Sequence, residues 1–424
     1  MPTNKKILII TYYWPPCGGA GVQRWLKFAK YLPEYGWEPI VITVDPDFAH
    51  YPAIDESLEK DINDSLKVYK TKALNYFRPG LAGKSGRSKD TAYSGNKGMN
   101  NRLARFIRGN FFIPDPRRGW NSHAVKMASE IIRKEGIEYV ISTSPPHSTQ
   151  LIGLKLKTIF PEIKWICDLR DPWTDIYYYD KFHGTWPARI YDRRLENKVL
   201  RKADSIISVG DKLADLFSVK LQDRAKKITV ITNGYDEQDF SSLKKNPPST
   251  LTITYVGSLS DQYPVKSLIE SLRKLSDRGT EFKFRFIGVC PPGIKRKITS
   301  ALPEDSFYYL SYRSHREALT AMITSSVLLV LIPDNKHNKI IITGKLFEYL
   351  RTELPILAIG PKDGEAAGII SECKAGSIFG KEDIEDITAF LSSGEINRIN
   401  YTAPQRYDRR KLTARLAELL DKLQ

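Results

Sequence analysis

The chain has 424 residues, which is too long for a single hydrophobic core and predicts two domains of about 200 residues each. Its composition, 41% hydrophobic and 27% charged, is that of a soluble globular protein. Its longest apolar runs fall short of the roughly 18 residues that a membrane-spanning helix needs, and the formal net charge of +16 indicates an anionic partner.

The first residues, MPTNKKILIITYYWPP, contain a short apolar stretch that is followed by tyrosines and a pair of prolines. This pattern predicts a first β-strand and not a signal peptide. The four cysteines are far apart, without a CxxC pair or histidines at ligand spacing. We therefore expect neither disulfides nor a zinc site, and a cytoplasmic location.

Short β-branched runs alternate with amphipathic helical stretches along the chain. Because a crossover helix connects each strand of a parallel sheet to the next, this alternation predicts an α/β fold with parallel sheets. The same architecture occurs in both halves of the chain. The predicted strands are residues 6–11, 38–44, 65–70, 139–143, 164–169, 205–210, 251–257, 282–288, 307–312, 327–332 and 354–360.

Half of the net charge lies between Arg78 and Arg118, where ten lysines and arginines stand against two aspartates. Such a local excess favours either a phosphate-rich ligand or a membrane surface, but a solvated loop explains it equally well. Residues 78–100 are rich in Gly, Ser and Lys and predict a flexible insertion. Residues 102–112 predict a basic amphipathic helix, with Leu103, Phe106 and Ile107 on the face opposite Arg102, Arg105 and Arg108. This helix would lie on an anionic bilayer or pack its apolar face on the domain.

The polar stretch 241–250 contains two prolines and is the best candidate for a linker. We therefore expect a first domain over residues 1–240, with the basic insertion at about 78–118, and a second over 241–404. Residues 405–424 form a final helix with leucines at helical spacing.

Three glycines, Gly18, Gly19 and Gly21, connect the first strand to a helix. Glycines let the backbone approach a ligand closely, and the free N–H groups at a helix start attract phosphate or a developing oxyanion. The loop differs from the GxGxxG pattern of dinucleotide-binding proteins, and the geometry of a tight turn explains the glycines as well.

Charged residues lie at the C-terminal end of the fifth strand of the first half. Asp168, Arg170 and Asp171 lie where open α/β sheets bind ligands, although Asp168 and Arg170 would also suit a structural ion pair. His147 follows the preceding strand and is either a catalytic or acceptor-binding group or a structural donor. The aromatic run at 174–186 would stack on a sugar or cover the edge of the domain.

The second half contains cations at two helix starts. Gly257 and Ser258 end a strand, and Lys266 begins the helix that follows it. Further along, Lys345 and Glu348 share one face of a helix near its N-terminus. A lysine there neutralises a diphosphate and a carboxylate one turn on accepts ribose hydroxyls, whereas the alternative is an ordinary surface ion pair.

Taken together, these stretches resemble glycosyltransferase family 4, a retaining family of the GT-B fold, in its cell-surface polysaccharide branch. The likeness covers nearly the whole chain, with the motifs in the family's order: ILIITYYWPPCGGAGVQR, CDLRDPW, KADSIISVG, KITVITNGYD, ITYVGSLSDQYPVKSLIESL and GKLFEYLRTELPILA. The resemblance implies two Rossmann-like domains, the second of which holds the donor nucleotide. It also implies an acceptor held mainly by the first domain and a C-terminal helix that crosses back to it.

The resemblance assigns donor-binding roles residue by residue. Glu348 matches the ribose-binding second glutamate of the family's E-x7-E pattern, but Ile340 stands where the first glutamate belongs. Lys266 matches the diphosphate lysine, and Ser258 stands where its arginine partner belongs, so another cation takes that role. Candidates are Arg313, Lys339 and Lys345. The complete expected donor site is Gly19, Gly21, Gly257, Ser258, Lys266, Arg313, Lys345, Leu346 and Glu348.

Three residues of the first domain, Asp171, Arg170 and His147, are the expected catalytic and acceptor-binding set. No DxD motif is placed to hold a metal, so we expect no metal and no other cofactor. The resemblance implies a UDP- or GDP-sugar donor, because such donors dominate the family. The expected acceptor is a hydroxyl, with a lipid-linked saccharide and a peripheral membrane contact among the possibilities. A nucleotide-sugar 2-epimerase of the same fold is the rival enzyme. A basic nucleic-acid-binding scaffold is less favoured, because stacking aromatics are scarce among the basic residues.

Overall fold

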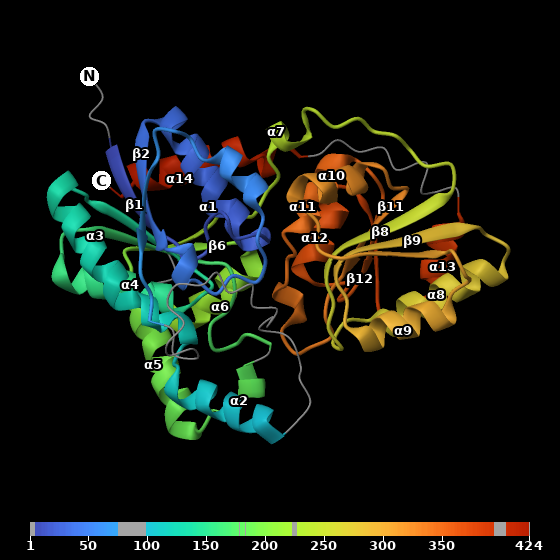
Figure 1. Ribbon diagram of the computed structural model, residues 1–424, viewed down its shortest axis with the longest axis horizontal. Coiled ribbons are helices and arrows are strands. Elements are labelled where there is room, and N and C mark those ends of the chain that lie inside the picture. The colour runs from blue at the N-terminus through green and yellow to red at the C-terminus, as the bar shows by residue number, and fades with distance from the viewer. Residues whose placement is uncertain are drawn as a thin grey trace. The chain divides into compact units, whose positions relative to one another are not determined.

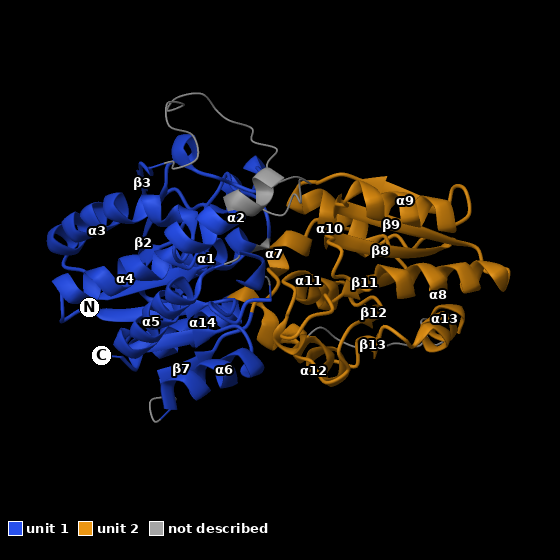
Figure 2. Cartoon of the chain, turned by 90° about the horizontal axis from the view of Figure 1, so that it is seen from below, with its two compact units in different colours: residues 1–232, 410–424 blue, residues 233–409 orange. Residues whose placement is uncertain are grey.

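A computed structural model of the chain describes residues 5–74, 99–177, 179–182, 184–222, 227–393 and 404–423. The chain forms two compact units (Figures 1 and 2): unit 1 comprises Met1–Thr232 and Arg410–Gln424, and unit 2 comprises Asn233–Arg409. Each unit is built on a parallel β-sheet with flanking helices. The predicted α/β fold with two Rossmann-like domains is therefore confirmed.

The sheet of unit 1 has the strand order β3-β2-β1-β4-β5-β6-β7. All of its neighbouring strands pair in parallel. The order reverses between β1 and β4, and open α/β sheets bind ligands beyond the carboxyl ends of the strands at such a point. The strands are β1 (Lys5–Ile10), β2 (Trp37–Val44), β3 (Lys67–Thr71), β4 (Tyr139–Ser144), β5 (Lys164–Leu169), β6 (Ser205–Ser208) and β7 (Ile228–Val230).

Helices cover both faces of this sheet. Successive side chains of a strand point to opposite faces, so Ile7 and Ile9 pack in one core cluster while Leu8 and Ile10 pack in the other. This two-sided burial explains why the strands are continuous apolar runs. Ahead of its final helix, unit 1 contains the helices α1 (Ala20–Tyr31), α2 (Met99–Phe111), α3 (Asn121–Glu135), α4 (Ser148–Ile159), α5 (Trp186–Lys202) and α6 (Asp211–Leu221).

The last helix, α14 (Arg409–Asp421), packs on unit 1 as expected. Leu412, Leu416 and Leu420 are fully buried in the same cluster as Ile7 and Ile9. Its end is joined to β1 by an ion pair of 2.7 Å between Lys5 and Asp421. The leucines whose spacing predicted a packed final helix therefore form the face of α14 that packs on unit 1.

The sheet of unit 2 has the order β10-β9-β8-β11-β12-β13 and is also parallel throughout. Its order reverses between β8 and β11. The strands are β8 (Leu251–Ser258), β9 (Phe282–Val289), β10 (Phe307–Leu310), β11 (Val327–Leu331), β12 (Ile356–Ile359) and β13 (Gly376–Phe379). The helices are α7 (Glu237–Phe240), α8 (Val265–Asp277), α9 (Pro292–Ala301), α10 (His315–Ile323), α11 (Lys345–Thr352), α12 (Glu365–Glu372) and α13 (Ile384–Ser392).

Two strands have no counterpart in the sequence analysis. Edge strands β7 and β13 are three and four residues long and only half-buried, so they lack a recognisable apolar run. The boundary between the units also differs from the expected one after residue 240. It lies at 232/233 because Tyr235 and Phe240 pack in the core of unit 2.

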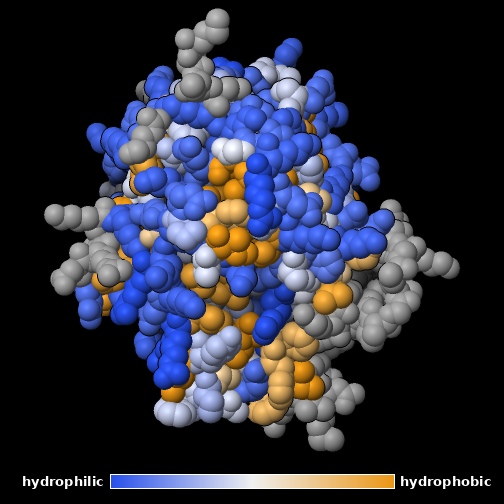
Figure 3. Space-filling model, turned by 90° about the vertical axis from the view of Figure 1, so that its left-hand side faces the viewer, coloured by the Kyte–Doolittle hydropathy of each residue, from blue (hydrophilic) through white to orange (hydrophobic). Residues whose placement is uncertain are grey.

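Part of the basic insertion, residues 78–98, lies outside the described residues, as do the side chains of Arg102 and Leu103. The predicted basic helix is α2. Among the described residues, none of the helices combines the length and hydropathy that a membrane crossing requires. One side of the molecule, shown in Figure 3, is mainly hydrophilic with a narrower band of hydrophobic residues.

Candidate functional site

Asp168 lies at the end of β5 and anchors the edge of the sheet in unit 1. Its side chain and that of Arg24 on α1 are fully buried and form an ion pair of 2.9 Å. Trp25 Nε1 and Thr143 Oγ1 also donate to Asp168 Oδ2, at 2.8 and 2.7 Å. Asp168 therefore pairs with Arg24, not with Arg170, and both of its oxygens are occupied by structural contacts.

Arg170 braces two neighbouring segments at the carboxyl edge. Its guanidinium donates to the carbonyl oxygens of Ser144 (3.0 Å), Gly21 (2.7 Å) and Pro145 (3.1 Å), in the loops after β4 and β1. Burial lowers the pKa of this guanidinium, although the carboxylates of Asp168 and Asp171 oppose the shift. The arginine thus sets the shape of the edge and adds positive charge to it.

The glycine-rich loop needs two of its glycines for different reasons. Gly19 caps α1 with φ +98°, a conformation that side chains disfavour. A Cβ atom at Gly21 would lie 3.4 Å from Arg170 Nη1, so this glycine permits the close approach of the guanidinium. Both predicted residues therefore lie at the edge of unit 1, whereas the other residues of the expected donor site belong to unit 2.

Asp171 follows directly and is only partly buried. No described residue forms a hydrogen bond or ion pair with its carboxylate. Burial raises its pKa, while the charge of Arg170 lowers it. A carboxylate at this edge without a partner among the described residues is suited to accept a hydrogen bond from a ligand hydroxyl.

His147 begins α4, next to the carbonyls that Arg170 binds. Its ring stacks on Trp173, with centroids 5.2 Å apart. Both ring nitrogens are buried, and neither forms a hydrogen bond of ordinary geometry with a described residue. Desolvation lowers its pKa to about 4, although Asp115 opposes the shift. The imidazole is therefore neutral near pH 7. His147, Arg170 and Asp171 gather at one edge, at the ends of β4 and β5.

The aromatic run after Asp171 is anchored and not free. Trp173, just before it, is buried and donates to Asp192 Oδ1 at 2.8 Å, and the hydroxyl of Tyr179 donates to Asp192 Oδ2 at 2.8 Å. Burial raises the pKa of Asp192 to about 6. Trp186, in contrast, is 76% exposed.

In unit 2, the ends of β8 and β9 come very close together. Gly257 and Gly288 have φ of +155° and +133°, and a Cβ atom on Gly288 would lie 2.0 Å from the Gly257 carbonyl oxygen. Ser258 is exposed at the end of β8. The edge of the second sheet therefore presents bare backbone, as expected for close approach of a ligand.

The predicted phosphate-binding cations of unit 2 are mostly exposed. The side chain of Lys266, in the first turn of α8, is 88% exposed and lies 3.6 Å from Glu270. Arg313 lies 3.8 Å from Glu317, and Lys339 is paired with Asp363. Exposed pairs of this kind are weak, so these side chains can turn toward an anionic ligand.

Lys345 and Glu348 face each other in the first turn of α11, with Nζ and Oε2 3.6 Å apart. Leu346 between them is fully buried in the core of unit 2. Its side chain therefore packs inward, and the donor contact of Leu346 stays a prediction that its main chain would have to fulfil. Only its main chain remains near the helix start.

Glu348 has a partner that the sequence analysis missed. His315 Nε2 at the start of α10 lies 2.9 Å from Glu348 Oε1. Lys345, His315 and Arg409 lower the pKa of the buried Glu348 to about 2, overcoming the opposing effect of desolvation. The Ser314–Glu317 capping box could have placed the start of α10, but no local signal links His315 to a glutamate 33 residues away.

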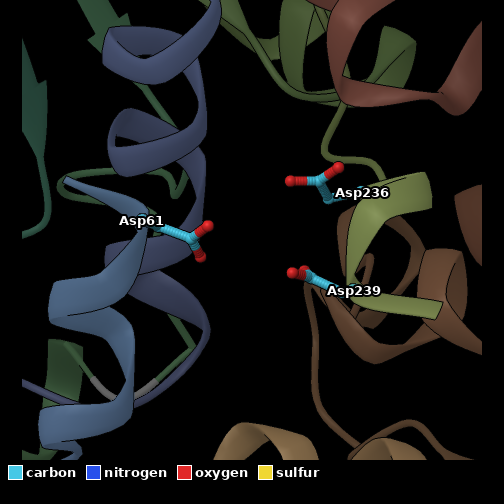
Figure 4. Close-up of side chains that lie close together, drawn as sticks. All are labelled: Asp61, Asp236 and Asp239. Atoms are coloured by element: carbon cyan, nitrogen blue, oxygen red, sulfur yellow. The ribbon is translucent and has the colours of Figure 1, made fainter. Parts of the chain in front are cut away.

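A second carboxylate faces the same imidazole. Asp239 Oδ2, on α7, lies 4.0 Å from His315 Nδ1, and the neighbouring Asp236 caps α7 by accepting from Gln238 N. Figure 4 shows the side chains of the two aspartates. His315 therefore lies between two carboxylates within unit 2. Asp61, also drawn in Figure 4, belongs to unit 1 and is paired with Lys27 and Lys30.

Comparison with known proteins decides the family. The family model described as Glycosyltransferase Family 4 matches residues 18–239, more than half of the chain. The chain belongs to glycosyltransferase family 4. The resemblance inferred from the motifs is thus confirmed, and the class of activity that follows is glycosyl transfer. No curated protein sequence matches the chain.

Solved structures with the same fold span nearly the whole of this family 4 chain. A glycosyltransferase from Rickettsia africae is 14% identical, with a TM-score of 0.59, and the match covers 99% of this chain and 97% of that one. The apo lipopolysaccharide outer core galactosyltransferase WaaB is also 14% identical, with a TM-score of 0.59 and coverage of 99% and 100%. A putative UDP-N-acetylglucosamine 2-epimerase from Listeria monocytogenes is 12% identical, with a TM-score of 0.60 and coverage of 99% and 97%. At these identities the likeness shows the fold alone, which transferases and an epimerase share.

Proposed function

We propose that this family 4 protein transfers a sugar from a nucleotide-diphosphate sugar to a hydroxyl acceptor, with retention at the anomeric carbon, in the assembly of cell-surface polysaccharide or glycolipid. The observation that carries the proposal is the pair Lys345 and Glu348 at the start of α11, in a chain that belongs to a glycosyltransferase family. A cation and an ionised carboxylate in one helical turn match the diphosphate and the ribose of such a donor.

The donor site lies at the carboxyl edge of unit 2. Glu348 accepts hydrogen bonds from the ribose, while Lys345, Lys266 and Arg313 supply positive charge to the diphosphate. Gly257 and Ser258 leave room for the phosphates beside the backbone. The structure entitled "S. aureus MnaA-UDP co-structure" has the same fold at a TM-score of 0.53 and 12% identity, and a UDP- or GDP-sugar is the donor that we propose here.

In the reaction, the bond between the anomeric carbon and the β-phosphate oxygen breaks as the acceptor oxygen bonds to the same face of that carbon. The acceptor proton passes to the departing phosphate oxygen. Lysines and helix N-termini stabilise the diphosphate as its charge develops, and such preorganised charge is usually the largest catalytic contribution. Asp171 or the neutral His147 orients the acceptor hydroxyl, and Arg170 holds the loops around them.

We further propose that the reaction needs no metal and no other cofactor. The motivation is the sequence, in which no DxD motif is placed for a metal at the donor site. The triplet DPD at 45–47 follows β2 in unit 1, and Asp45 accepts a hydrogen bond from Asp47 N as the cap of a short 3-10 helix. The lysines of unit 2 would supply the positive charge that a metal supplies elsewhere.

A peripheral contact with the anionic inner face of the membrane completes the proposal. The exposed large side chains of α2 and of the start of α5 support it: Phe106, Phe111, Trp186 and Tyr191 are 41%, 67%, 76% and 51% exposed. Phe106, Phe111 and Tyr191 line a shallow groove between the two helices, together with Pro187. Arg105 is exposed, and Arg108 stacks on Phe182 at 4.1 Å from the ring centroid. Basic residues around an apolar patch suit an anionic bilayer.

A screen of nucleotide-sugars by thermal shift, followed by turnover assays, tests the proposed activity. A bound donor at 100 times its Kd stabilises the protein by about 2.7 kcal/mol. Transfer to an added saccharide or glycolipid acceptor, with an unchanged anomeric configuration in the product, is the expected result. Conversion of the donor sugar to its epimer without any acceptor would instead identify a 2-epimerase and reject the proposal.

A further inference from the structure

His315 is the described side chain that hydrogen-bonds Glu348, the proposed ribose-binding residue. Nε2 of His315 lies 2.9 Å from Oε1 of Glu348, and both side chains are 12% exposed. The pKa of Glu348 is lowered to about 2, so its carboxylate is ionised and only accepts. The hydrogen on Nε2 must therefore point at Oε1.

The two oxygens of Glu348 differ in their surroundings. Oε1 accepts from His315, whereas Oε2 is buried and accepts no hydrogen bond from a described residue. The ammonium of Lys345 lies near it, with Nζ 3.6 Å away. A buried carboxylate oxygen without a hydrogen bond is costly, and a ligand hydroxyl would satisfy it.

The fold holds His315 firmly. Ser314 and Glu317 form a capping box at the start of α10, which sets the first turn of this helix. Farther along α10, Leu319 and Met322 share a buried cluster with Phe347 and Leu350 of α11. Two described carboxylates face the imidazole, those of Glu348 on α11 and Asp239 on α7. Lys345 of α11 and Arg409 at the start of α14 act on Glu348.

We propose that His315 is a positioning residue for donor recognition: by holding Oε1, it orients Glu348 so that Oε2 accepts the ribose hydroxyls of the nucleotide. This inference rests on the proposed function, because it assumes that Glu348 binds ribose. Lys345 turns from Oε2 toward the diphosphate as the nucleotide enters. His315 itself touches no reacting atom, so it acts on the recognition of ribose and not on the phosphates or the base.

Discrimination between ribose and dideoxyribose tests the role directly. We would measure the binding of UDP and 2′,3′-dideoxy-UDP by calorimetry, or of the guanosine pair if the wild type prefers GDP. The full-length variants would be His315→Ala, His315→Gln and Glu348→Ala. A matched control is Thr320→Ala, an exposed position one turn along α10.

We expect wild-type protein to prefer the ribonucleotide by about tenfold to a hundredfold, the scale of a charge-assisted hydrogen bond. His315→Ala should remove most of this preference while leaving the affinity for the dideoxynucleotide within about twofold. In His315→Gln an amide N–H replaces Nε2–H as the donor to Oε1, so the preference should largely return. Thr320→Ala should match the wild type.

Three outcomes would overturn the proposal. An unchanged preference in a folded His315→Ala protein, together with its loss in Glu348→Ala, would show that Glu348 needs no positioning. If His315→Ala weakened the binding of both nucleotides equally, the role of the histidine would be merely structural. A preference that survives Glu348→Ala would reject the donor site itself. If His315→Ala does not fold, the test uses His315→Gln and Asp239→Asn instead. The proposed role of His315 then requires that both variants retain the preference for the ribonucleotide and that Glu348→Ala lose it.

Discussion

Arg24 and Asp168 are 144 residues apart in the sequence and form a fully buried ion pair of 2.9 Å beneath the edge of the sheet in unit 1. The guanidinium also donates to the carbonyl oxygens of Ile231 and Thr232, beyond the end of β7. The pair thus ties α1, β5 and the last segment of the sheet together beneath the residues that we propose for the acceptor.

Removing one partner of this pair should destabilise unit 1 strongly, because the other charge would remain buried and uncompensated. We expect Arg24→Met or Asp168→Ala to lower the free energy of unfolding by about 3–5 kcal/mol. Chemical denaturation followed by circular dichroism measures it. Asp421→Ala, which breaks the exposed ion pair with Lys5, should change the stability by less than about 1 kcal/mol. Equal effects of the buried and exposed variants would contradict this assignment.

The lysines of unit 2 should affect the diphosphate and not the nucleoside. Lys266→Ala and Lys345→Ala should each weaken UDP or GDP by about 1–2 kcal/mol while leaving the affinity for uridine or guanosine unchanged, since the attraction is to phosphate. Lys274→Ala, near the other end of α8 and paired with Glu385, is the control. If the variants lost as much affinity for the nucleoside as for the nucleotide, these lysines would not bind the diphosphate specifically.

Asp192 should make the stability depend on pH. Its pKa is raised to about 6 in the folded protein from 3.8, so the folded state binds more protons between about pH 4 and 6. The contribution of this group to stability therefore rises as the pH falls through 6. Asn has no such titration, so Asp192→Asn should be more stable relative to wild type at pH 8 than at pH 4.5, by about 2 kcal/mol. Unfolding of both proteins at the two pH values measures the difference, and a pH-independent difference would show that the carboxyl titrates normally.

Transfer should be insensitive to chelation. If lysines and helix N-termini stabilise the leaving diphosphate, the initial rate in excess EDTA should equal that in added magnesium or manganese. The assay uses the donor found by the thermal-shift screen. Activity that disappears with EDTA and returns with a divalent metal would reject metal-independent transfer.

Vesicle flotation should detect the membrane contact. We expect binding that requires anionic lipid and falls with added salt, because each basic residue near such a surface contributes about 1 kcal/mol. Replacing Arg105 and Arg108 by Ser should weaken vesicle binding, because positive charge is lost. The double variant Phe111→Ser and Trp186→Ser should also weaken it, because fewer apolar side chains can insert into the bilayer. Val219→Ser, at another exposed apolar position of unit 1, is the matched control. A wild-type protein that stays at the bottom of the gradient at low salt would disprove the contact.

Local patterns in the sequence were enough to predict the fold class, most of the strands and helices, and the family. Buried parallel strands need continuous apolar residues, and amphipathic helices need a 3.6-residue period, so both the two α/β halves and the docked final helix follow from periodicity. The motifs determined the family and brought Lys345, Glu348 and Asp171 into view. Short edge strands such as β7 are only half-buried, so their residues show no continuous apolar run in the sequence.

Only the tertiary structure decided the partners of those residues. Asp168 pairs with Arg24 and Glu348 with His315 because α1 packs on its sheet and α10 beside α11, and these contacts join positions far apart in the chain. Exposure likewise depends on packing: Leu346 turns inward, while Phe111 lies open on α2. Periodicity records which face of an element is apolar, but the neighbour that covers that face, or leaves it bare, is set by how the elements assemble.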